Sequence, residues 1–132
     1  MNRPELNQFA EAISSLIPNK NHFLEGVPTS QDELNSMFKI EMEDGTHSSN
    51  PSDFGFTFAQ ANSAFATQKT NDKLLDLRQV RDAKLAESDW TQGADSPLTD
   101  SKKTEWATYR QSLRDITDSA TSLDDVSWPE KP

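Results

Sequence analysis

The sequence predicts a mainly α-helical protein with a minor β-hairpin. Apolar side chains recur at helical spacing near both ends of the chain, and one short stretch, residues 37–42, alternates between the two faces of a strand. The expected order is an N-terminal amphipathic helix, a small hairpin, a long helix and a C-terminal antiparallel helix pair. Only 33% of the residues are hydrophobic, so the core is thin for the surface that it must cover.

The first predicted element is an amphipathic helix near the N-terminus. Pro4 suits its first turn, and Pro18 ends the pattern. Such a stripe can pack in a core or dock on a partner, and core packing is the commoner of the two. The apolar residues that share one face at 100° per residue are Leu6, Phe9, Ala10, Ile13, Leu16 and Ile17.

A short helical turn and a hairpin are expected next. Ser30 and Glu33 have the spacing of a capping box. Residues 37–42 then predict a strand, and residues 43–53, rich in Gly, Ser, Asn and Pro, predict a loop. The stretch "FGFTF", residues 54–58, is expected to complete the hairpin. The apolar face of the first strand would hold Phe38, Ile40 and Met42.

The long helix begins at a second capping-box spacing, Thr57 with Gln60. Its first turns should bury Phe58, Ala61 and Phe65. Whether it breaks at residues 67–72 is open from the sequence. From residue 72 to residue 87 the composition favours a helix, but the apolar residues are scattered around the helical wheel. They are Leu74, Leu75, Leu77, Val80 and Leu85.

The last helix is predicted to begin after Thr99 as its N-cap. Its stretch "EWATYRQSLRDI" places four apolar side chains within an arc of roughly 80°. This seam is expected to pack on the preceding helix as an antiparallel pair, with Trp90 and Leu98 at the turn end. Trp128, which is followed by Pro129, is expected to act as an anchor on the pair or on another molecule. The seam consists of Trp106, Tyr109, Leu113 and Ile116.

The length fits one small domain with an extension. We expect two regions, 1–56 with the first helix and the hairpin and 57–132 with the helices. The formal charge is −9, and residues 1–56 hold 3 Lys or Arg against 9 Asp or Glu. An acidic chain without a basic stripe argues against nucleic-acid binding and favours a basic or neutral protein partner. No long apolar run or signal-peptide pattern is evident, which predicts a soluble, cytosolic protein without membrane contact.

The sequence predicts no enzyme and no catalytic, cofactor-binding or metal-binding residues. The chain has no cysteine, which removes thiolate and disulfide chemistry. His22 and His47, expected on loops, have no nucleophile arranged beside them. An acidic cluster in the loop region lacks the ligand spacing of a calcium loop. The cluster consists of Glu41, Glu43, Asp44 and Asp53.

The last third of the chain resembles a known family. The run "SDWTQGADSPLTDSKKTEWATYRQSLRDI", followed by "VSWPEKP" at the end, is similar to the C-terminal module of phage tail assembly chaperones, small proteins associated with tail-fibre assembly. The resemblance extends over residues 72–132. It implies a non-enzymatic assembly role, without a cofactor, in which the module binds a phage tail or tail-fibre protein in the host cytoplasm.

An aromatic surface with adjacent arginines suits such a contact, because Trp, Tyr and Arg dominate binding hot spots. The arginines could pair with carboxylates of the partner, and Arg110 could also stack on Trp106. The expected partner-binding residues are Trp90, Trp106, Tyr109, Arg110, Arg114 and Trp128. The alternative is a structural subunit of the mature virion, in its tail, fibre or baseplate. The residues leave this choice and the oligomeric state open.

Overall fold

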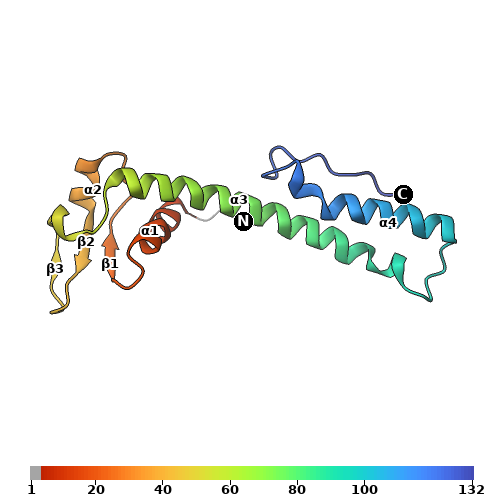
Figure 1. Cartoon of the computed structure of the whole chain (residues 1–132), viewed down its shortest axis with the longest axis horizontal. Helices are drawn as coiled ribbons and strands as arrows, with labels where there is room; N and C mark the ends of the chain where they lie inside the picture. The colour runs from red at the N-terminus through yellow and green to blue at the C-terminus, as the bar shows by residue number, and fades with distance from the viewer. Residues whose placement is uncertain (1–3) are drawn as a thin grey trace. The chain divides into compact units, whose positions relative to one another are not determined.

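The computed structural model describes residues 4–132 and confirms a mainly helical fold with a small antiparallel sheet (Figure 1). The chain forms two compact units, an N-terminal one that ends at Lys69 and a C-terminal one, Thr70–Pro132. The expected division after residue 56 stays a prediction about domains. The elements are α1 (Glu5–Leu16), β1 (His22–Leu24), α2 (Gln31–Met37), β2 (Phe38–Glu41), β3 (His47–Ser48), α3 (Phe58–Ser88) and α4 (Asp100–Arg114), with 3-10 turns at Pro51–Asp53, Asp89–Gln92 and Ile116–Asp118.

Helix α3 begins where the sequence predicts and continues without a break through residues 67–72. Its start is a reciprocal capping box. The Gln60 N–H donates to Thr57 Oγ1 at 3.3 Å, and the Thr57 N–H donates to Gln60 Oε1 at 2.9 Å. No Gly or Pro lies between Phe58 and Ser88, so nothing in the backbone interrupts the helix. This settles the question that the sequence left open.

The sheet of the N-terminal unit has the order β1-β2-β3, and both pairs are antiparallel. Strand β2 lies in the predicted stretch, but its predicted partner at residues 54–58 is wrong. The second strand of that hairpin is β3, inside the expected loop, and β1 was not anticipated. At Gly55 the backbone turns with φ +80°, which is incompatible with a regular strand. Phe54 and Phe56 instead enter the core from an irregular segment.

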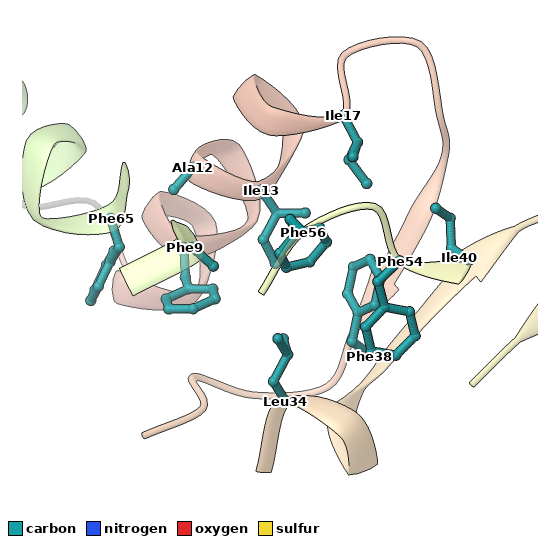
Figure 2. Packing of buried hydrophobic residues seen from close by; sticks show 11 residues of the cluster. Phe9, Ala12, Ile13, Ile17, Leu34, Phe38, Ile40, Phe54, Phe56 and Phe65 are labelled. Atoms are coloured by element: carbon teal, nitrogen blue, oxygen red, sulfur yellow. The ribbon is translucent and has the colours of Figure 1, made fainter. Parts of the chain in front are cut away.

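The core of the N-terminal unit is a cluster of phenylalanines (Figure 2). The Phe38 ring packs edge-on against Phe54 and Phe56, with centroids 4.7 and 5.1 Å apart. The Phe9 ring of α1 lies 5.0 Å from Phe65 of α3. The edge-on contacts of Phe38 stabilise the core beyond the area that they bury. The buried hydrophobic residues are Phe9, Ala12, Ile13, Ile17, Leu34, Phe38, Ile40, Phe54, Phe56, Ala61 and Phe65.

Helix α1 buries a narrower face than its apolar stripe suggests. Phe9 and Ile13 are fully buried, whereas Leu6 and Leu16, near the two ends of the helix, are each 37% exposed. Ala12, which the stripe did not include, is buried, while Ala10 is only half-buried. Leu6 and Leu16 therefore lie at the edge of the core, whereas Ile17, directly after the helix, is buried in it.

Helix α2 is held at its start by the predicted cap. The Glu33 N–H donates to Ser30 Oγ at 3.1 Å. The Glu33 carboxylate accepts from the Thr29 N–H at 2.7 Å, one residue before the usual partner of a capping box. Gln31 then joins α2 to α3, because its Oε1 accepts from the Phe58 N–H at 2.8 Å. Leu34, in the middle of α2, is fully buried in the core.

In the C-terminal unit the end of α3 and helix α4 lie side by side and run in opposite directions (Figure 1). Thr99 is the N-cap of α4, since its Oγ1 accepts from the Lys102 N–H at 3.2 Å. Three residues of the predicted seam are buried, and Trp106 is half-buried. Leu75 of α3 is 52% exposed, which accounts for the scattered apolar pattern. The buried apolar residues of this unit are Leu77, Tyr109, Leu113, Ile116 and Ala120.

Phe38→Ala tests the aromatic core. We expect the N-terminal unit to lose roughly 3–5 kcal/mol of its free energy of unfolding, because a large buried ring leaves a cavity. Phe23→Ala is the matched control, since Phe23 pairs with Lys39 on β2 and is 51% exposed. Denaturant titration of the full chain measures both. Equal losses for the two variants would contradict the packing described here.

The stability of the N-terminal unit should depend on the protonation of His22. Burial lowers the pKa of His22 below its ordinary 6.5, and a hydrogen bond to the backbone of Ala10 acts in the opposite direction. As the pH falls through the ordinary pKa, the unfolded state therefore binds a proton that the folded state resists, and the free energy of unfolding decreases. Urea titrations between about pH 8 and pH 5.5 measure this slope. His22→Asn should flatten it; an unchanged slope in the variant would show that other groups cause it.

Candidate functional site

Three of the predicted partner-binding residues form one aromatic group on the C-terminal unit. Trp90 lies in the 3-10 turn after α3 and is 54% exposed. Its ring centroid is 6.2 Å from that of Trp106, which in turn meets the Tyr109 ring edge-on at 5.5 Å. Tyr109 is the buried member of this group. Trp90 and Trp106 are therefore the accessible part of this aromatic group.

Arg110 makes its contacts inside the unit. Its guanidinium donates to the Leu85 carbonyl at 2.7 Å, to Ser88 Oγ at 2.8 Å and to Asp89 Oδ1 at 2.7 Å. The last carbonyls of a helix have no intrahelical partner, and positive charge is favoured there. Arg110 thus caps α3, and its expected stacking on Trp106 or pairing with a partner stays a prediction. It supports the site from beneath.

Arg114 lies one helical turn further along α4 and is exposed. Its Nη1 donates to Gln111 Oε1 at 3.4 Å, a contact within the same helix. Its predicted part in partner binding stays a prediction.

The C-terminal tail packs back on α3, the first of the two possibilities that the sequence offered for Trp128. Lys84 Nζ lies 5.1 Å from the centroid of the Trp128 ring, in a cation–π contact. Lys131 Nζ pairs with Glu87 Oε2 at 3.1 Å. Both contacts are on the surface, so each is worth little alone. The tail is therefore bound to α3 by weak surface contacts, one cation–π contact and one ion pair.

A cavity of about 260 Å³ lies between the two tryptophans, the end of α3 and the C-terminal tail. The two tryptophans supply its apolar surface, and the residues that hold the tail supply its charged surface. A hollow of this volume has room for a side chain. The lining residues are Lys84, Glu87, Ser88, Trp90, Trp106 and Lys131.

The other residues weighed for chemistry are not drawn together. The histidines lie in strands β1 and β3 instead of loops. Asp53 accepts a hydrogen bond from Ser48 Oγ at 2.6 Å. Asp44 accepts from Thr46 Oγ1 and from the Thr46 N–H, and these bonds lower the pKa of Asp44. Within residues 4–132, no three His, Asp or Glu side chains are grouped to hold a metal ion.

Comparison with known proteins agrees with the resemblance in the last third. Residues 74–132 match the family described as phage tail assembly chaperone protein. The C-terminal module belongs to this family. The matched residues contain Trp90, Trp106, the cavity and the whole tail. The match of this module supports a role in tail assembly.

A solved structure is also similar to the chain. It is the solution structure of protein CV0426 from Chromobacterium violaceum, which is 34% identical, covers 71% of this chain and 95% of its own, and gives a TM-score of 0.40. No curated protein matches the chain. In the described residues, no helix is both long enough and apolar enough to cross a membrane.

Sequence reasoning missed the charged half of the site. Lys84 and Glu87 are three residues apart on α3, and Lys131 lies next to the last residue. In the sequence, Lys84 and Glu87 are typical of an exposed helix face, and Lys131 is typical of a polar tail. Only the return of the tail along α3 brings them together, and no local pattern encodes that return.

Arg110→Met tests the cap beneath the site. We expect the free energy of unfolding of the C-terminal unit to fall by about 1–3 kcal/mol, because the Leu85 carbonyl, Ser88 Oγ and Asp89 lose their hydrogen bonds to the guanidinium. Arg114→Met, an exposed position one turn away, should change it by less than about 0.5 kcal/mol. Thermal and denaturant unfolding of both variants measure the difference. A large loss in the Arg114 variant with none in the Arg110 variant would overturn this assignment.

Proposed function

We propose that this protein is a non-enzymatic assembly factor that binds a phage tail or tail-fibre protein in the host cytoplasm and leaves before the particle is complete. The observation that supports it most is the exposed Trp90 beside Trp106, at the mouth of a cavity, within the part of the chain that matches the family. A large, rigid indole left half in water gains much from burial in a partner.

The six residues expected from the sequence then have different parts in the contact. Trp90, Trp106 and Trp128 would touch the partner, because none of them is fully buried. Tyr109 and Arg110 would hold the tryptophans from beneath, because both are buried. Arg114 would lie at the edge of the contact.

The transient role is preferred over that of a virion subunit. A permanent subunit would explain an ordered polar tail through contacts with permanent neighbours. Here Lys84 and Glu87 of the same chain hold the tail. The tail therefore needs no neighbour, and the family's description as chaperones fits a contact that ends.

Trp90→Ala tests the binding surface. We expect it to reduce the recovery of tail or fibre protein with the tagged chain by at least about tenfold, as loss of a binding hot spot does. The chain is purified from cells that make the tail and fibre proteins of its phage, and mass spectrometry quantifies the partners.

Phe23→Ala is the matched control, because Phe23 is an aromatic residue of equal exposure, 51% against 54% for Trp90, in the other unit. It should leave recovery unchanged. If the Phe23 variant loses the partner and the Trp90 variant keeps it, the binding surface lies on the N-terminal unit and the proposal fails.

A further inference from the structure

We propose that the cavity beside Trp90 and Trp106 receives an acidic, apolar peptide segment of the partner, with one apolar side chain against the indoles and a neighbouring carboxylate on Lys84 and Lys131. This inference rests on the proposed function and adds the chemistry of the segment that is recognised. It is carried by the apolar lining of the cavity and by the excess of positive charge in that lining.

The apolar part of the segment follows from size and surface. A hollow of about 260 Å³ holds one or two side chains of a peptide and is too small for a helix, whose diameter with side chains is about 10–12 Å. The indole faces favour an aliphatic or proline side chain, as in the aromatic grooves that bind extended peptides. The segment should therefore bind in an extended form.

The acidic part follows from the charges at the cavity. Lys84 and Lys131 line it together with a single carboxylate, Glu87, so the local charge is positive on a chain whose net charge is −9. Lys84 Nζ faces the Trp128 ring and Lys131 Nζ faces Glu87. An ammonium group has three N–H donors, so each can also serve a second acceptor. A carboxylate is the acceptor that this charge favours.

The chain's own tail reaches the edge of this cavity. The segment that returns to α3 reads "LDDVSWPEK", residues 123–131, with two aspartates, a Val, a Trp-Pro step and a glutamate. Lys84 receives its aromatic ring at the edge of the cavity. Lys131 of the tail lines the cavity together with Trp90 and Trp106, so the tail itself supplies one of the two ammonium groups that a carboxylate of the partner would meet.

Two other occupants fit less well. A second copy of the chain would bring a further net charge of −9, and like net charges oppose association. A nucleic-acid backbone would meet the same repulsion over the whole surface. A short acidic segment on a neutral or basic partner meets only the local positive charge.

The experiment titrates three synthetic nonapeptides into the full ¹⁵N-labelled chain. One peptide carries a Leu-Pro step between aspartates, and the others carry asparagines or lysines in place of the aspartates. The chain has three tryptophans, so three indole N–H signals report binding. We expect the aspartate peptide to shift the signals of Trp90 and Trp106 and to bind about fivefold tighter than the asparagine peptide, as two exposed ion pairs would provide.

The double variant Lys84→Gln with Lys131→Gln should abolish this preference. The double variant Lys102→Gln with Lys103→Gln removes the same charge from the first turn of α4, outside the cavity lining, and should keep it. If the first double variant loosens the tail, the wild-type chain still provides a test, because about 0.5 M salt should reduce the aspartate preference by screening.

Equal binding of the aspartate and asparagine peptides overturns the inference, as does tightest binding of the lysine peptide or no indole shift at millimolar peptide. Indole shifts that appear on concentrating the chain alone, with a dimer in sedimentation, would assign the cavity to a second copy and overturn it too. If Trp90→Ala reduces the recovery of a tail or fibre protein but the aspartate peptide does not bind, only this inference is wrong. If Trp90→Ala keeps the partner, the proposed function falls as well.

Discussion

The end of helix α3 is the constraint on which the C-terminal unit depends. At Ser88 the helix stops and its last carbonyls need partners, and the Arg110 side chain from α4 provides one for Leu85. The same guanidinium binds Ser88 Oγ and Asp89, while Thr91 Oγ1 donates to the Ser88 carbonyl at 2.6 Å. These bonds join the two helices and set the turn that follows. Trp90 lies between the two fixed residues Asp89 and Thr91, which explains why it can remain exposed beside Trp106.

Scarcity of apolar residues shapes both units. The N-terminal unit concentrates its few large side chains in one aromatic cluster, to which α1, α2, β2, the segment around Gly55 and α3 all contribute. The C-terminal unit has fewer buried apolar residues and supplements them with the charged hydrogen bonds of Arg110. Because its tail is held by two surface contacts of charged groups, salt should affect the tail more than the helix pair. A surface of this kind suits contacts that form and break.

The helices and their starts could be predicted from the sequence, because capping boxes and periodic apolar residues are local signals. Ser30, Thr57 and Thr99 each cap a helix as expected. The sheet could not be predicted in full. Strand β1 has three residues and an outward Phe23, and β3 has two residues within a polar stretch. Strands this short depend on pairing with β2, which is not encoded locally.

The candidate site was likewise only half predictable. The spacing of Trp106, Tyr109 and Leu113 indicated a packed seam, and Trp90 could be placed at its end. The inward direction of Arg110 could not be foreseen, because its acceptors at Leu85 and Ser88 lie in the preceding helix. The positions of Lys84 and Lys131 depend on the path of the tail, which is a tertiary feature.

The central claim is that the chain serves assembly and does not stay in the particle. Quantitative mass spectrometry of gradient-purified phage particles, beside the crude lysate, tests it most directly. We predict that the chain is recovered from the lysate with a tail or fibre protein and is absent from purified particles. Stoichiometric copies in the particle would contradict the account and make the protein a structural subunit of the tail.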